Sequence, residues 1–294
     1  MAKKLTLKQN MIWNSFGSII RLGCNYLITI VVVRLSHGFD AAGGLALAMS
    51  VSSLIAPLAE FRLRTIQVTD VEDRTSSGEY IGLRLITTSL ALVIGLLYSL
   101  ITCSLKSIPV IALYLISTMT VNVIEGFHAI DQKQLRMDYI GISYILQGVS
   151  NLAVFAIALS VGNSLLLAVA AMAVANIAIC LLFDLKKALS FGTIEIKFDL
   201  KKDARILVSL CPLVIAQICS STVLTVPKQY LAASCGAAAL GIYSSVASPA
   251  TIVQMGASYI YSPLLGEFAT RFHKDKGDGI QLLKKTSILI TVLS

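Results

Sequence analysis

The sequence predicts an all-α membrane protein with about eight complete transmembrane helices. Of the 294 residues, 56% are hydrophobic and only 14% are charged, and the mean hydropathy is +0.79. A soluble domain carries about 25% charged residues. A membrane-spanning helix needs roughly 20 mostly apolar residues, and the chain meets this requirement repeatedly along its length.

Eight apolar segments are long enough to cross a bilayer. The predicted helices cover 11–33, 41–60, 83–105, 108–128, 140–161, 164–183, 205–227 and 239–262. A ninth helix begins near Thr286 and is cut off at Ser294. The sequence therefore predicts a first lobe of six helices and part of a second lobe.

Two helix starts are marked by residues with the spacing of a capping box. Thr6 is followed three residues later by Gln9, and Ser76 by Glu79, each just before an apolar run. In such a box the hydroxyl and the Glu or Gln side chain satisfy backbone N–H groups of the first helical turn.

The distribution of positive charge predicts that the N-terminus lies in the cytoplasm. With that orientation, 20 Lys and Arg residues fall in cytoplasmic segments and 3 on the other side, namely Arg34, Lys106 and Lys228. Such a bias is the positive-inside signal of multi-pass proteins. It accounts for the net charge of +8 without nucleic acid as a partner.

Three parts follow from the helix order. Residues 1–184 form the N-terminal six-helix lobe, 185–204 a cytoplasmic linker with alternating apolar and charged residues, and 205–294 an incomplete C-terminal lobe. Arg34 and Lys228, each followed by a short turn with glycine, are separated by six helices. This spacing favours an internal repeat, as transporters often have.

The first helix carries polar residues along one face. Asn14, Ser18, Arg21, Asn25 and Thr29 follow one another at steps of three or four, which is the spacing of one helix face. An arginine near mid-membrane costs roughly 2.5–3.5 kcal/mol on insertion scales, so Arg21 must face protein or water. It either binds an anion in a cavity or is satisfied by neighbouring carbonyls and hydroxyls.

Five further helices carry comparable stripes. They are Ser50, Ser53, Pro57 and Glu60; Thr118, Asn122 and Glu125; Tyr144, Gln147 and Asn151; Gln217, Ser221, Thr225 and Lys228; and Ser248, Thr251, Gln254, Ser258 and Tyr261. So many stripes favour a polar central cavity, although polar residues also join helices to one another. Lys228 is either a second cation at the cavity mouth or an interface lysine that reaches to the headgroups.

Three titratable residues near the inner ends of helices are candidates for coupling transport to protons. They are Glu60, Glu125 and His128. The alternative is that they are solvated helix ends that pair with nearby charges. No P-loop, GxSxG or HExxH motif occurs, the three histidines lie in separate regions, and the six cysteines form no CxxC pair. The sequence therefore predicts no enzyme activity, no cofactor and no metal site.

Two segments resemble a known family. Phe61–Val71 with Tyr80–Arg84 resembles the segment after helix two in O-antigen-type polysaccharide flippases. Val226–Tyr230 with Ala239–Tyr243 is similar to the turn between helices seven and eight of the same proteins, where Lys228 stands in place of a more common arginine. These flippases belong to the multidrug, oligosaccharidyl-lipid and polysaccharide exporter superfamily.

The resemblance implies a multi-pass protein of the bacterial inner membrane that flips undecaprenyl-diphosphate-linked oligosaccharides, the repeat units of O-antigen or capsule. It implies two six-helix lobes that rock around a cavity lined by helices one, two, seven and eight. Arg21 and Lys228 are then expected at the anionic head group and Gln217 and Gln254 at the sugar, with Asn25 as a further substrate-binding residue. The expected partners are the lipid-linked oligosaccharide, membrane lipids and the polysaccharide polymerase machinery.

The family usually has 12 or more helices, so the chain is expected to be C-terminally truncated. Three other functions stay open. A cation-coupled multidrug exporter of the same superfamily would prefer acidic residues in its cavity. A membrane polymerase or transferase commonly has a large outer loop, and the outer loops here are short. The third alternative is an inactive membrane fragment or scaffold.

Overall fold

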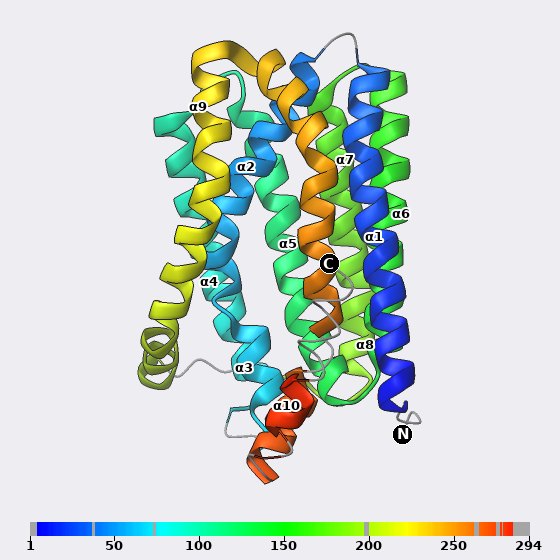
Figure 1. The fold of residues 1–294 in the computed structure, drawn as a ribbon, viewed down its shortest axis with the longest axis vertical. Coiled ribbons are helices and arrows are strands. Elements are labelled where there is room, and N and C mark those ends of the chain that lie inside the picture. The colour runs from blue at the N-terminus through cyan, green and yellow to red at the C-terminus, as the bar shows by residue number, and fades with distance from the viewer. Residues whose placement is uncertain are drawn as a thin grey trace.

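A computed structural model describes residues 5–36, 39–72, 75–196, 200–261, 265–274, 277 and 279–284. Within these ranges all regular elements are helices (Figure 1). They are α1 (Leu7–Leu35), α2 (Asp40–Glu60), α3 (Leu63–Thr69), α4 (Ser77–Thr102), α5 (Ile108–Lys133), α6 (Met137–Gly162), α7 (Leu165–Ile179), the π-helical turn η1 (Cys180–Asp184), α8 (Leu185–Leu189), α9 (Leu200–Tyr261) and α10 (Leu265–Lys274). The predicted ninth helix falls at 286–294, outside the described residues.

Seven helical stretches in the described part are long and apolar enough to cross a membrane. The last of them includes two predicted helices, because α9 reverses direction at Gly236 (Figure 1). Gly236 has φ 85° and ψ 171°, a conformation that only glycine adopts readily. The all-α membrane fold with about eight helices is therefore confirmed.

The predicted helices match the observed ones, with differences at their ends. Both capping boxes form, with Thr6 Oγ1 accepting from Gln9 N at 3.3 Å and Ser76 Oγ accepting from Glu79 N at 3.2 Å. At their inner ends the helices extend by several polar residues beyond the apolar segments that predicted them. The predicted outer turn at 228–238 is too long, because α9 stays helical to Gly236.

A short helix after α2 was not predicted. Phe61 and Arg62 both adopt left-handed backbone conformations, with φ of 43° and 53°, and end α2. The chain then forms α3 (Leu63–Thr69), which runs under the bundle (Figure 1). Two consecutive left-handed residues without glycine are uncommon, so neighbouring elements must hold this break in place.

Helix α4 holds the end of α2. Arg84 Nη1 donates to the backbone carbonyl of Glu60 at 3.1 Å, and Thr87 Oγ1 donates to that of Ala59 at 3.0 Å. The last carbonyls of a helix have no partner within the helix. Arg84, which is 2% exposed, and Thr87 supply that partner from the neighbouring helix.

The segment before α9 lies against the start of α4. Residues 193–196 have no regular structure, and a Cβ on Gly78 would lie 1.9 Å from the carbonyl oxygen of Glu195. Lys202 Nζ lies 2.6 Å from Glu79 Oε2. The linker is thus fastened to α4, while the division of the chain into a lobe, a linker and a second partial lobe stays a prediction.

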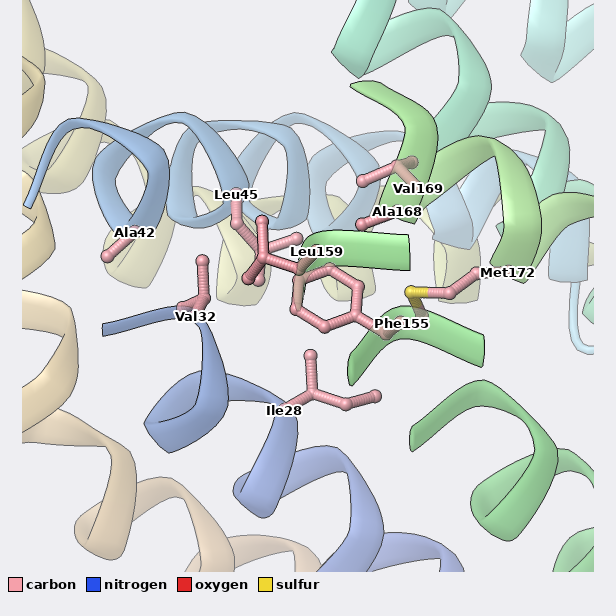
Figure 2. Close-up of a cluster of buried hydrophobic side chains, with 9 residues drawn as sticks. All are labelled: Ile28, Val32, Ala42, Leu45, Phe155, Leu159, Ala168, Val169 and Met172. Atoms are coloured by element: carbon pink, nitrogen blue, oxygen red, sulfur yellow. The ribbon is translucent and has the colours of Figure 1, made fainter. Parts of the chain in front are cut away.

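The first six spanning helices share an apolar core. Figure 2 shows one cluster in which α1, α2, α6 and α7 meet. Its buried members are Ile28, Val32, Ala42, Leu45, Phe155, Leu159, Ala168, Val169 and Met172. Facing away from the core, Val161 is 85% exposed and Ile101 is 84% exposed. Apolar side chains so exposed suit contact with lipid, so the protein is a multi-pass membrane protein, and the bacterial inner membrane fits.

Glycines bring α1 and α6 into backbone contact. A Cβ on Gly17 would lie 2.4 Å from the Gly141 carbonyl oxygen, and one on Gly141 would lie 2.4 Å from that of Trp13. A Cβ on Gly148 would lie 2.9 Å from the Cα of Arg21. Small residues permit such close packing of membrane helices, and here the packing places Arg21 directly against α6.

A second close contact joins α2 to the second arm of α9. A Cβ on Gly43 would lie 1.8 Å from the carbonyl oxygen of Ala237. A Cβ on Gly241 would lie 2.6 Å from that of Phe39. These residues stand at the start of α2 and just after the kink in α9, so the two helices meet at the predicted outer end of the bundle.

Candidate functional site

A polar cavity of about 310 Å³ lies toward the predicted inner end of the bundle. Its lining comes from α1 to α5 and the α2–α3 break. The lining residues are Arg21, Ala56, Glu60, Arg62, Arg64, Thr65, Arg84, Thr118, Val121, Asn122 and Glu125. The polar stripe predicted on 108–128 therefore faces this cavity with all three of its members.

Positive charge predominates in the lining. Four guanidinium groups, those of Arg21, Arg62, Arg64 and Arg84, face two carboxylates, those of Glu60 and Glu125. A cleft lined mainly by one sign of charge between low-dielectric walls attracts ions of the opposite sign. The arrangement favours an anionic group over a cationic one.

Glu125 is the centre of the polar contacts. Arg64 Nη1 donates to Glu125 Oε2, and the Tyr144 hydroxyl donates to Oε1 at 3.0 Å. Arg21 Nη1 lies 3.8 Å from the same Oε1 atom. Arg64 Nη2 also donates to Gln132 Oε1 at 2.9 Å. The carboxylate thus joins side chains from α1, α3 and α6 at the wall of the cavity.

Arg21 is held by α6. Its Nη1 donates to Gln147 Oε1 at 3.2 Å, and its guanidinium lies 4.7 Å from the centre of the Tyr144 ring. Tyr144, Gln147 and Asn151, the stripe predicted on 140–161, are all buried. Arg21 is therefore satisfied by protein groups and at the same time lines the cavity, so the structure combines the two alternatives for this residue.

Two buried donors on the cavity wall have no protein partner. These are Asn122 Nδ2 and Arg84 Nε. A buried N–H group without a hydrogen bond is unfavourable by about 1–3 kcal/mol, and such groups are satisfied by water or by a ligand. Both atoms are inaccessible from the cavity itself, so they belong to its wall and do not contact a molecule inside it.

Gln217 connects α9 to the cavity. Its Nε2 donates to Glu60 Oε2 at 3.0 Å. No α9 side chain that the structure describes is part of the lining itself. The observed lining therefore differs from the expected set of helices one, two, seven and eight, with α3, α4 and α5 taking a large share.

The other predicted substrate residues lie elsewhere. Asn25 is exposed on α1 and does not line the cavity. The side chain of Gln254 lies outside the described residues. The substrate roles predicted for these residues, as for Arg21, Gln217 and Lys228, stay predictions.

Lys228 is far from the cavity. The next residue, Gln229, accepts a hydrogen bond from the Tyr98 hydroxyl at 2.5 Å, near the outer end of α4. Tyr98 is separated from Arg84, which lines the cavity, by about 21 Å along the helix at 1.5 Å per residue. The structure thus does not bring Lys228 and Arg21 to one head-group site.

His128, a candidate for coupling, is fully buried behind Glu125. Its Nε2 lies 3.2 Å from Asp184 Oδ1, and its ring packs edge-on against Tyr144. Sequence reasoning missed Arg64, Arg84 and Asp184 as members of the site. Charged residues at the ends of apolar segments could have indicated a site, but the same pattern is typical of solvated loops.

No protein-family model matches the sequence, and no curated protein matches it. Solved structures do. The MATE transporter VcmN of Vibrio cholerae in its bent form is similar with a TM-score of 0.64 at 14% identity, over 96% of this chain and 68% of that chain. The MATE multidrug transporter DinF-BH is similar with a TM-score of 0.70 at 14% identity, over 98% and 71% of the two chains.

This chain has the fold of a MATE transporter. At 14% identity these likenesses show the fold alone, and they do not distinguish a flippase from a drug exporter. Both named neighbours are transporters rather than enzymes, in line with the absence of soluble catalytic motifs from the sequence.

Proposed function

We propose that this protein is a membrane exporter that moves amphipathic substrates carrying an anionic group, by alternating access of the cavity. The observation that carries the proposal is the cavity itself, with four arginines and two glutamates inside a transporter fold. The excess of arginines over glutamates supports it, because guanidinium groups bind anionic oxygen atoms well.

The arrangement fits one state of such a cycle. At the outer end, Gly43 and Gly241 place α2 and α9 in backbone contact. At the other end, Arg62 lines the cavity and is exposed. A cavity that is closed outside and accessible from the inner side is what the inward-facing state of an alternating-access transporter requires.

The named neighbours favour drug export over the predicted O-antigen flippase, since one of them is a multidrug transporter. We therefore give anionic amphipathic drugs as the first candidate cargo. The drug-exporter alternative was expected to show acidic residues, and both acids here are bound, Glu125 to Arg64 and Glu60 to Gln217. This feature supports anionic drugs rather than cationic ones.

The positive charge of the cavity also supports a second candidate cargo, the undecaprenyl-diphosphate-linked oligosaccharide. Guanidinium groups bind phosphate oxygens well, and Arg62, Arg64 and Arg84 line one cavity. In that case the partners are the lipid-linked oligosaccharide, membrane lipids and the polysaccharide polymerase machinery.

Two strains test the proposal. The full protein is expressed in a strain without its own drug exporters, and resistance to anionic and cationic amphipathic drugs is compared. It is also expressed in a strain without its O-antigen flippase, and surface polysaccharide is scored. Arg21→Ala is the cavity variant, and Lys106→Gln, which removes an exposed cation remote from the cavity, is the matched control.

Resistance to anionic drugs that Arg21→Ala abolishes and Lys106→Gln preserves supports the first candidate. Restored polysaccharide with the same pattern supports the second. Resistance to cationic drugs alone contradicts the anionic cargo. No activity in either strain, despite stable insertion, contradicts export.

A further inference from the structure

A cluster of buried titratable groups lies behind the cavity wall. His128 on α5 is fully buried between two carboxylates. Its Nε2 lies 3.2 Å from Asp184 Oδ1, and its Nδ1 lies 3.7 Å from Glu125 Oε1. Of these groups only Glu125 lines the cavity. The imidazole therefore connects a carboxylate at the cavity with one in the protein interior.

Asp131 stands one helical turn after His128. It is 0% exposed, and neither of its carboxylate oxygens has a hydrogen-bond partner. Burying an ionised carboxylate without partners is so unfavourable that such a group takes up a proton instead. The environment of Asp131 therefore requires the neutral carboxylic acid.

The π-helical turn η1 (Cys180–Asp184) places the third acid. Asp184 is its last residue and is 1% exposed, with Oδ2 lacking a hydrogen-bond partner. π-helical turns are rare and occur frequently at functional sites, because they redirect the side chains of one turn. Here the turn directs Asp184 toward His128.

The charges around Asp131 come from several elements. His128 is on α5 itself, Asp184 on η1, Arg64 on α3 and Asp138 on α6. Helix α7 carries no titratable residue. From α4 and α2, Arg84 and Glu60 act on Glu125. The cluster is thus surrounded by protein charges from several elements.

We propose that Asp131, His128 and Asp184 form a proton-binding site that exchanges with the cavity through Glu125. The Glu125 carboxyl takes a proton from cavity water and passes it to His128 Nδ1, and the proton on Nε2 moves to Asp184. Asp131, one helical turn after His128 and without a hydrogen-bond partner, holds a second proton of the site. Only O–H and N–H bonds form and break, and no other reactant is needed.

Proton binding by this site does not depend on the proposed function, whereas a role in coupling export to protons rests on it. A proton held at Asp131 keeps its side chain neutral and so stabilises the arrangement in which this part of α5 is buried. Loss of that proton leaves an unpartnered charge, which favours a rearrangement that admits water. The site would in this way link protonation to the conformation of the cavity.

Infrared difference spectroscopy tests the site directly on the purified full protein in lipid nanodiscs. We expect a carbonyl stretch of a protonated carboxyl group at neutral pH that shifts in heavy water and disappears in Asp131→Asn. The control is Asp138→Asn, since Asp138 accepts from Arg136 at 2.8 Å and 2.9 Å. Persistence of the full band in Asp131→Asn overturns the proposal.

Thermal unfolding gives a second readout that does not require activity. Unfolding exposes Asp131 to water, where a carboxyl is ionised at neutral pH, so the unfolded state binds fewer protons. Stability must then fall as pH rises through neutrality. We expect this part of the slope to vanish in Asp131→Asn and to remain in Asp138→Asn. An unchanged slope in Asp131→Asn counts against the site.

Transport assays separate the two levels of the proposal. Export that proceeds equally with and without a proton gradient, while the infrared band behaves as expected, overturns coupling and leaves proton binding standing. Absence of export altogether contradicts the proposed function instead, and the infrared result is unaffected by it.

Discussion

Arg64 and Glu125 fasten the short helix α3 to the inner part of α5. Arg64 Nη1 donates to Glu125 Oε2, and both side chains are mostly shielded, with 17% and 20% of their side-chain surface exposed. This pair crosses the cavity wall and fixes the position of the chain after the left-handed residues Phe61 and Arg62.

Replacement of Glu125 by glutamine should destabilise the protein, because it leaves the Arg64 charge without a partner. Breaking a buried ion pair in this way lowers the free energy of unfolding by roughly 3–5 kcal/mol. Because both side chains are partly exposed, we expect a loss of about 3 kcal/mol or less. The measurement is the unfolding midpoint. The double variant Glu125→Gln/Arg64→Gln should recover part of the loss, and equal loss in both variants would refute the pairing.

The glycine contact between α1 and α6 gives a second prediction. Gly141→Ala should lower stability by about 1–3 kcal/mol, the usual result of forcing extra atoms into a packed interface. The new Cβ would lie 2.4 Å from the Trp13 carbonyl oxygen. Gly23→Ala on α1 is the matched control, since no atom lies within 4 Å of its Cβ position. Gly23→Ala should leave stability unchanged or raise it, because alanine favours a helix more than glycine does. Equal effects of the two variants would contradict a close contact at Gly141.

The end of α2 should depend on Thr87. Thr87→Val removes the hydroxyl that donates to the Ala59 carbonyl, and we expect a loss of about 1–3 kcal/mol, because that carbonyl is left without its partner. Thr120→Val is the control, since Thr120 is half-buried and donates only within its own helix, to Ile116. Equal midpoints for the two variants in thermal unfolding would contradict a role of Thr87 in ending α2.

The ion pair between Lys202 and Glu79 should contribute little. The side chains are 34% and 19% exposed, and exposed pairs contribute about 0.2–1 kcal/mol. Lys202→Ala should therefore change stability slightly, and less at high salt. Glu79→Ala should cost more, because Glu79 also closes the capping box with Ser76. A double-mutant cycle measures the pair alone, and a large coupling energy would contradict this estimate.

Cysteine labelling checks the predicted orientation. Ser104 and Ser190 are exposed at opposite ends of the bundle, in the turn after α4 and just after α8. In a background without the six native cysteines, Ser104→Cys should react with an impermeant reagent added outside intact cells. Ser190→Cys should react only after lysis. The reverse pattern would place the N-terminus outside.

The apolar runs were sufficient to predict the number of spans, because a bilayer requires a fixed length of apolar helix. The stripe of Thr118, Asn122 and Glu125 was sufficient to indicate a polar interior, because helical spacing fixes a common face. Which partner each side chain binds depends on helix packing across the bundle. The contact of Glu125 with Arg64, 61 residues away in the sequence, has no local signal.

Other features depend on tertiary structure alone. The break at Phe61 and Arg62 has no glycine or proline to mark it, and it forms because α4 supplies Arg84 and Thr87 as partners. The π-helical turn before Asp184 is likewise invisible in the apolar pattern. The expected helix end at 227 was too early, since α9 stays helical to Gly236, and the substrate role of Lys228 stays a prediction.

The contact of Gly43 and Gly241 at the outer end is made by backbone atoms together with the methyl group of Ala42. At these two glycines no side chain larger than a methyl group is among the nearest contacts, so α2 and α9 can part and meet again there without displacing a bulky side chain. A methyl group at Gly241 would act as a wedge, 2.6 Å from the Phe39 carbonyl oxygen. This methyl group would destabilise only the state in which α2 and α9 are in contact. A single added carbon atom would therefore shift the population toward the state in which they are apart, without any ligand.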